Sequence, residues 1–115
     1  MIPSSRKVGK DLFETLMKKG RFYPSESFGA RVFIDTFPVP ARFSVVVAKK
    51  LEKSAVKRNT YKRRVYSLLQ PFISRVSLGT VCVVFLKKKI NRSDLLLFTV
   101  EVETFLKKSG LLRTQ

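Results

Sequence analysis

Half of the sixteen residues between positions 49 and 64 are Lys or Arg, and this stretch contains a single acid, Glu52. So many like charges cannot be buried together, so the segment must keep one side at the surface. From Ser54 onward the apolar residues recur at helical spacing, at Tyr61, Val65, Leu68 and Leu69. This spacing predicts an amphipathic helix from residue 54 to residue 69 whose apolar face packs on the rest of the chain. Pro71 is expected to end or kink it.

The same helix carries a second set of residues with a shared direction. Asn59, Lys62, Arg63 and Tyr66 are spaced i, i+3, i+4, i+7, which predicts a face roughly opposite the apolar one. Arginine offers a fork of donors to phosphate, lysine a point charge, and asparagine both a donor and an acceptor. A solvated helix surface usually alternates its charges, and this one does not. The pattern favours a nucleic acid partner without distinguishing RNA from DNA.

Composition supports the same class of partner. The 115 residues include 24 Lys and Arg against 8 Asp and Glu, giving a formal net charge of +16. Because 44% of the residues are hydrophobic, the chain can bury one core, and its length leaves little room for a second. We therefore expect residues 1–115 to form a single nucleic-acid-binding domain, partnered by a polyanion.

Several functions are disfavoured by what the sequence contains. It has no His and a single cysteine, Cys82, so nucleophilic systems based on His and His-ligated zinc sites are excluded. One Cys cannot build a multi-thiolate metal site and the eight acids are scattered along the chain, so we predict no metal site, and we expect Cys82 to be a core residue. Apolar runs such as residues 81–86 are far shorter than the roughly 20 residues of a membrane helix. With no secretory signal in residues 1–10, we expect a cytoplasmic protein without a membrane partner.

The rest of the chain reads as short alternating elements. The patterns predict a helix over residues 11–19, a loop over 21–29, and strands over 30–37, 42–48 and 79–86. Residues 87–92 read as a basic connection. The last segment is ambiguous, since residues 100–104 alternate like a strand, but the apolar residues from Leu95 to Leu106 share a helical face, so we predict a helix. On a helix Glu101 and Glu103 diverge, and we expect both to face solvent.

Two motifs of this chain resemble those of a known family. Residues 42–50 read RFSVVVAKK, and after seven further residues positions 58–64 read RNTYKRR. These resemble the R-x-G-x-x-V-[SA]-K-K strand and the R-N-R-x-K-R helix of the bacterial ribonuclease P protein subunit. The spacing of Phe13, Leu16 and Gly20 also resembles the F-x-x-V-x-x-x-G pattern of the family's N-terminal helix.

The resemblance implies a fold and an activity. The fold would be an α+β two-layer sandwich of order αβββαβα, with a central, mostly antiparallel sheet and a left-handed β-α-β crossover that carries the basic helix. The protein would be the non-catalytic component of ribonuclease P, whose partners are a catalytic RNA and precursor tRNA, and DNA is not expected. That RNA removes the 5′ leader using bound Mg²⁺, so no cofactor is expected on protein residues alone. The alternative is a basic ribosomal or other structural RNA-binding protein.

The resemblance also implies two binding surfaces. The catalytic RNA would contact four residues of the helix motif, supported by five neighbouring cations: Arg58, Asn59, Lys62 and Arg63, then Arg64, Lys49, Lys50, Lys57 and Lys53. The leader would lie in a cleft between the N-terminal helix and the sheet, lined by Phe13, Met17 and Arg42, with Phe33 or Asp35 as the position on the strand.

This chain departs from the family pattern at five positions. Thr60 and Tyr66 stand where the family has Arg, Ser44 stands where the family strand has Gly, Met17 takes the place of an aromatic residue, and Glu52 introduces an acid near the site. Losing two cations should weaken contact with phosphate, and Lys53 and Lys57 are placed to compensate.

Overall fold

The computed structural model describes residues 9–35 and 40–112. Its elements occur in the order helix, three strands, helix, strand, helix, which confirms the predicted αβββαβα arrangement. They are α1 (Lys10–Lys19), β1 (Arg21–Pro24), β2 (Phe28–Ile34), β3 (Arg42–Val46), α2 (Ala55–Ile73), β4 (Thr80–Leu86), the short 3-10 helix η2 (Arg92–Asp94) and α3 (Leu95–Lys108).

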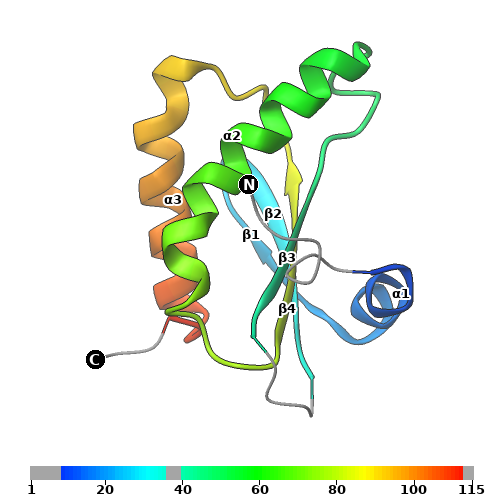
Figure 1. Cartoon of the computed structure of the whole chain (residues 1–115), viewed down its shortest axis with the longest axis vertical. Coiled ribbons are helices and arrows are strands. Elements are labelled where there is room, and N and C mark those ends of the chain that lie inside the picture. The colour runs from blue at the N-terminus through cyan, green and yellow to red at the C-terminus, as the bar shows by residue number, and fades with distance from the viewer. Residues whose placement is uncertain (1–8, 36–39, 113–115) are drawn as a thin grey trace.

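The four strands form one sheet in the order β1-β2-β4-β3. The β1–β2 and β2–β4 pairs are antiparallel, and β3 pairs with β4 in parallel. Two adjacent parallel strands need a crossover connection, and α2 supplies it (Figure 1). The sheet is therefore mostly antiparallel with one β-α-β unit, as expected, and the basic helix is that crossover.

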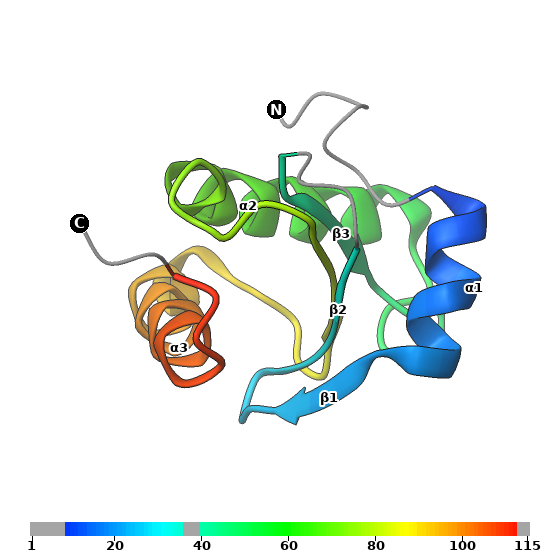
Figure 2. The same cartoon turned by 90° about the horizontal axis from the view of Figure 1, so that it is seen from below.

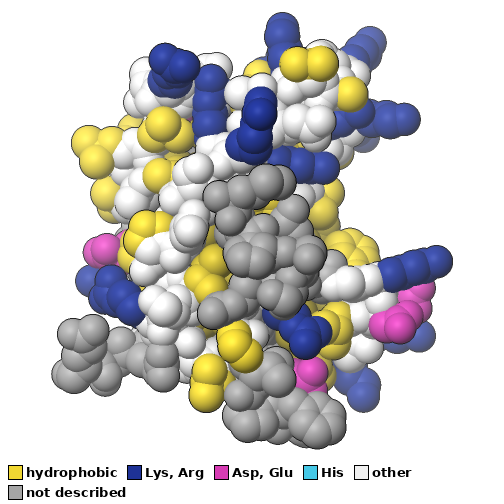
Figure 3. All heavy atoms as spheres, viewed as in Figure 1, with side chains coloured by type: hydrophobic (Ala, Val, Ile, Leu, Met, Phe, Trp, Pro, Cys, Tyr) yellow, Lys and Arg dark blue, Asp and Glu magenta, His cyan; other side chains and the backbone are white. Residues whose placement is uncertain are grey.

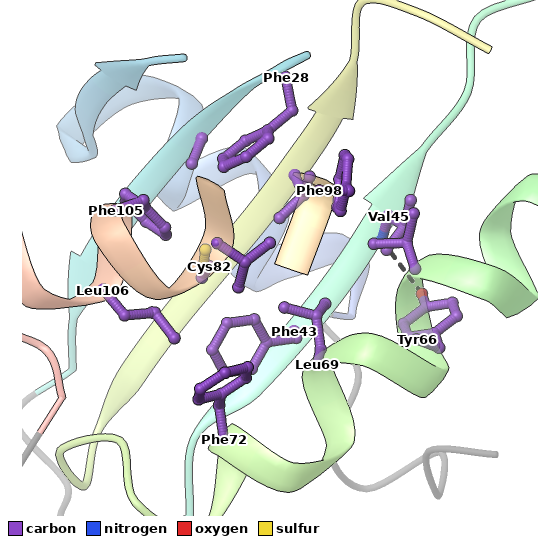
Figure 4. Close-up of a cluster of buried hydrophobic side chains, with 14 of the residues drawn as sticks. Phe28, Phe43, Val45, Tyr66, Leu69, Phe72, Cys82, Phe98, Phe105 and Leu106 are labelled. Carbon is purple, nitrogen blue, oxygen red and sulfur yellow. Dashed lines mark hydrogen bonds between the residues drawn. The ribbon is translucent and has the colours of Figure 1, made fainter. Parts of the chain in front are cut away.

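Helices cover both faces of the sheet to different extents. Figure 2 shows α2 and α3 side by side on one face and α1 on the other. The main core lies between the sheet and the α2–α3 layer (Figure 4), and its fully buried side chains include Phe28, Phe43, Leu69, Cys82, Phe98 and Leu106. Cys82 is the core residue that we predicted, and burial raises the pKa of its thiol.

The helix α2 continues past residue 69, the last residue of the helix that we predicted. Pro71 lies inside it, and the last turn includes the buried residues Phe72 and Ile73. An interior proline costs about 3 kcal/mol. Burying each of these two large apolar side chains stabilises the fold by about 1.5–3 kcal/mol, which offsets that cost. Tertiary packing therefore outweighs the local penalty at Pro71.

The prediction of a loop over residues 21–29 is wrong at both ends. Residues 21–24 form the edge strand β1, and residue 28 already begins β2. The ring of Tyr23 packs edge-on against Phe105, with the centroids 5.5 Å apart. Pro24 is tolerated because it ends an edge strand, where the missing N–H is not required by a neighbour. The next strand, predicted to reach Phe37, ends at Ile34, and residues 36 and 37 of that prediction lie outside the described residues.

The ambiguous last segment is helical, as predicted. The helix α3 buries Phe98, Val102, Phe105 and Leu106 against the sheet. The alternation over residues 100–104 is therefore a coincidence of spacing, and the helical periodicity decides the structure.

Candidate nucleic-acid interface

The cations predicted to bind RNA lie around the first half of α2. Ser54 caps this helix, because its hydroxyl accepts a hydrogen bond from the Lys57 N–H at 3.3 Å. Figure 3 shows Lys and Arg side chains gathered at the end of the molecule where α2 begins. We call these residues the basic surface: Lys49, Lys50, Lys53, Lys57, Asn59 and Arg63, all exposed, and Lys62, which is half-buried.

Arg58 also forms hydrogen bonds to the backbone before α2. Its Nη1 donates hydrogen bonds to the backbone carbonyls of Glu52 and Lys53, at 2.8 and 2.9 Å. These bonds tie the turn before α2 to the first turn of the helix. Both acceptors are neutral, so the positive charge of Arg58 is not cancelled.

Arg64 attaches α2 to a neighbouring basic turn. Its Nη1 donates to the carbonyl of Ile90 at 2.6 Å, and its guanidinium carbon lies 6.0 Å from the centroid of the Tyr61 ring. The turn that follows β4 is thereby held beside α2, and it brings Lys89 next to the basic surface. The sequence pattern marked residues 87–92 only as a connection, so Lys89 was not among the predicted RNA-binding residues. The three consecutive lysines at 87–89 were the available signal.

Glu52 is a buried acid among these cations, with 8% of its surface exposed. It accepts hydrogen bonds from the Ser54 N–H at 3.1 Å and the Tyr61 hydroxyl at 3.4 Å, and it pairs with Lys89 at 3.4 Å. The Ser54 N–H lowers the pKa of Glu52, burial opposes this, and the charges of Lys89 and Lys57 lower it further. Glu52 therefore remains ionised and holds the turn before α2 in place.

Among the described residues, the cations of α2 form no ion pair with an acid, although the charge of Lys57 acts on Glu52 at longer range. In the part of the chain that the structure describes, the ion pairs join Lys88 to Glu26, Lys89 to Glu52 and Lys107 to Glu103, and none of them includes a residue of α2. Like charges this close repel one another, and an anion shared between them relieves that repulsion. The surface is therefore suited to a phosphate backbone.

The prediction that Tyr66 shares the exposed face of α2 is wrong. Tyr66 is 9% exposed, and its hydroxyl oxygen accepts a hydrogen bond from the Val45 N–H at 3.1 Å (Figure 4). The first turns of α2 extend beyond the strands, whereas the later turns lie against the sheet (Figure 1). The same helical face consequently meets solvent at Asn59 and strand β3 at Tyr66.

The residues predicted to contact the leader lie on the other side of the sheet. On α1, Leu16 is buried, Phe13 is half-buried with its ring edge-on to Phe85 at 6.4 Å, and Met17 is 42% exposed. This helix contacts β2 and β4. Phe13 and Met17 therefore lie on the face of the sheet opposite α2 and α3 (Figure 2).

The two predicted sheet residues share that face. Phe33 and Arg42 both pair with Val81, one on each side of the central strand. Directly paired residues project to the same face, so both side chains lie on the α1 side. Both are half-buried. Of the two positions considered on the strand, Phe33 lies within β2, while Asp35 follows it and its N–H donates to the carbonyl of Gly79 at 2.7 Å.

The prediction that Glu101 faces solvent is wrong. Its carboxylate accepts hydrogen bonds from the Ser25 hydroxyl at 2.6 Å, the Ser27 N–H at 2.9 Å and the Ser27 hydroxyl at 2.5 Å. Burial would raise the pKa of Glu101, but these three bonds and the charge of Lys88 outweigh it and lower the pKa. Glu101 therefore fastens the turn between β1 and β2 to α3.

Glu103 instead forms an ion pair with Lys107, one helical turn later, at 3.3 Å.

Among the described residues, no three acidic, His or Cys side chains gather closely enough to share a metal ion. The same residues contain no helix that is both long and apolar enough to cross a membrane.

An α+β sandwich whose crossover helix presents unneutralised cations defines a small basic domain built to bind nucleic acid. The family model described as "Ribonuclease P" matches residues 4–110, and the chain belongs to this family. It is 30% identical over 113 residues to the ribonuclease P protein component of Nitrosomonas eutropha, covering 95% of this chain and 91% of that one. The corresponding protein of Pseudanabaena is 27% identical over 85 residues, 73% of each chain.

Solved structures agree on the fold. A Staphylococcus aureus RNase P protein, a mutant with defective mRNA degradation activity, superposes with a TM-score of 0.78 at 22% identity, covering 94% of this chain and 91% of that one. The RNase P protein of Thermotoga maritima gives 0.72 at 24% identity, with coverages of 84% and 89%. The expected fold and family are therefore confirmed.

Proposed function

We propose that this protein works as the protein component of ribonuclease P, in complex with a catalytic RNA that cleaves the 5′ leader from precursor tRNA. The observation that carries the proposal is the set of α2 cations without acidic partners among the described residues, on a chain of this family. Every neutralised phosphate releases counterions, so this surface would supply most of the affinity for RNA.

The basic surface would contact the catalytic RNA through charge-assisted hydrogen bonds. Arg63 and Lys57 are exposed and can approach phosphates, and Asn59 beside them offers a donor and an acceptor to a base edge or a 2′-hydroxyl. Arg58 and Arg64 would act in part by holding the neighbouring turns in position. Lys49, Lys50, Lys53 and Lys62 would add phosphate contacts around this centre.

The α1 face of the sheet would hold the single-stranded leader. Phe13 and Phe33 offer aromatic rings, Met17 an adaptable apolar side chain and Arg42 a guanidinium. Stacking on aromatic rings holds a single strand with little sequence preference, and each base contributes about 1–3 kcal/mol. The protein would in this way lengthen the contact between the enzyme and its substrate.

The hydrolysis itself would be carried by the RNA partner, with Mg²⁺ bound through that RNA. Hydrolysis of a phosphodiester by two metal ions uses several convergent carboxylates. The chain has eight acids, and Glu52 and Glu101 are engaged in holding turns. We propose that the complex acts in the cytoplasm.

Reconstitution tests this proposal directly. The protein is mixed at low Mg²⁺ with the ribonuclease P RNA of the same source and a precursor tRNA, and leader release is followed with and without protein. We expect cleavage to be enhanced by the protein. If cleavage is not enhanced, and the protein binds ribosomal RNA as tightly as ribonuclease P RNA, the alternative of a structural RNA-binding protein replaces the proposed function.

A further inference from the structure

Phe22 is an exposed aromatic residue on the edge strand β1. Its side chain is 48% exposed, and it pairs across the strands with Arg31. The guanidinium carbon of Arg31 lies 5.6 Å from the centroid of the Phe22 ring. Arg31 pairs on its other side with Val83 of the central strand, so Phe22 and Arg31 lie on the same sheet face as Phe33.

The position of this ring depends on a glycine. A Cβ atom added at Gly29 would come within 2.8 Å of Cε1 and of Cζ of Phe22, closer than such atoms can approach. The missing side chain therefore leaves the space in which the Phe22 ring rests on β2. An apolar ring is thus held at the surface with the Arg31 guanidinium over it, and almost half of Phe22 stays exposed to solvent.

We propose that Phe22 and Arg31 form a further position for single-stranded RNA, at which a base stacks on Phe22 and Arg31 contacts a neighbouring phosphate. This inference rests on the proposed function, because the strand it extends is the leader on the α1 face. Phe33 and Gly29 are the two diagonal neighbours of Phe22 across the β1–β2 pair, at positions typically about 7–8 Å away, and the Phe22 ring leans toward Gly29. One extended strand reaches both Phe22 and Phe33, and its path then runs from α1 over the edge of the sheet.

The chemistry favours RNA over an apolar partner at this position. A flat ring accepts any base through its π-face, and a guanidinium beside it adds attraction to phosphate and to the base. Lys87 brings a second cation to this part of the sheet, since its Cε lies 3.9 Å from the point that a Cβ atom of residue 29 would occupy and its Nζ donates to the carbonyl of Ser25 at 2.7 Å. One cation over the aromatic ring and a second near Gly29 suit a polyanion.

Leader length separates this position from the rest of the surface. The reconstituted complex is given a precursor tRNA with a leader of about ten nucleotides, within the site sizes of single-strand binders, or one trimmed to about two. We expect Phe22→Ala to weaken binding of the long-leader substrate about fivefold and to leave the short-leader substrate unchanged. Phe22→Tyr should restore the difference, and Leu96→Ala, an exposed apolar residue on α3, is the matched control.

The result that overturns the inference is equally specific. If Phe22→Ala retains the full preference for the long leader, or weakens both substrates equally, Phe22 does not stack a base. Phe22→Leu keeps the apolar bulk without the ring and should bind like Phe22→Ala while unfolding at the wild-type temperature. If the wild-type complex itself shows no preference for the long leader, the proposed leader surface fails together with this extension of it.

Discussion

The helices α2 and α3 lie side by side on the same face of the sheet, but their outer surfaces differ in kind (Figure 1). On α3 the acids Glu101 and Glu103 both have partners, and the exposed positions include the apolar residues Leu96, Leu97 and Val100. On α2 the exposed cations have no acidic partner among the described residues. Packing fixes only the inner face of each helix, so the outer face of α2 was free to accumulate charge for a ligand.

The largest expected difference between the two helices concerns RNA affinity. Lys62→Ala/Arg63→Ala should weaken binding to ribonuclease P RNA by about 3 kcal/mol, roughly a hundredfold, because each charge-assisted bond contributes about 1.5–3 kcal/mol. Lys107→Ala/Lys108→Ala on α3 removes the same charge and should change affinity little. Titrations of both variants at one salt concentration make the comparison, and equal losses would show that only net charge matters.

The reverse asymmetry is expected for stability. Glu101→Ala removes the acceptor of three hydrogen bonds and should lower the free energy of unfolding by about 2 kcal/mol. Glu103→Ala, which loses one surface ion pair, should cost about 0.3 kcal/mol. Denaturant unfolding measures both, and a Glu101→Ala protein as stable as the wild type would mean that the β1–β2 turn needs no anchor.

A smaller effect is expected where α2 changes from solvent to sheet. Tyr66→Phe removes the hydroxyl that accepts the Val45 N–H and should lower the free energy of unfolding by about 1 kcal/mol. Its RNA affinity should equal that of the wild type, because Tyr66 is buried. Weaker RNA binding by a stably folded Tyr66→Phe protein would place this residue in the interface after all.

The smallest effect is a pH dependence that arises from Glu101. Its pKa is lowered in the folded state, so its contribution is fully present above the ordinary Glu value and is lost as pH falls through the folded-state pKa. The stability gap between wild type and Glu101→Gln should therefore narrow on acidification. Chemical unfolding at a series of acidic pH values measures this difference in the free energy of unfolding. A difference that stays constant would mean that Glu101 does not cause the pH dependence.

Much of the fold could be predicted from the sequence because its strongest patterns are local. The helical periodicity around Val65, the β-branched run of β4 and the RFSVVVAKK motif each indicate their structure without knowledge of neighbours. The strand β1 could not be predicted in this way, because four residues ending in Pro24 have no alternation and become a strand only by pairing with β2. Pro71 likewise stays helical only because the residues after it are buried.

The candidate site likewise has a part that the sequence predicts and a part that depends on the fold. The cations of α2 were visible as a charge run, whereas the bonds from Arg58 to two carbonyls and from Arg64 to Ile90 depend on where two turns fold. Phe22 was visible only as part of a loop with three aromatics, and its place above Gly29 follows from the strand register. Residue type indicates the chemistry, and the register determines which groups can act together.

The salt dependence of RNA binding tests the central claim most directly. The logarithm of the binding constant for ribonuclease P RNA is measured against the logarithm of salt concentration for wild type, Arg58→Ala and Arg63→Ala. Replacing the exposed Arg75, just beyond the far end of α2, by Ala provides the control. If the α2 cations contact phosphates, the slope should flatten by about one unit in each of the first two variants and stay unchanged in the control. Wild-type slopes in both Arg58→Ala and Arg63→Ala would contradict the account.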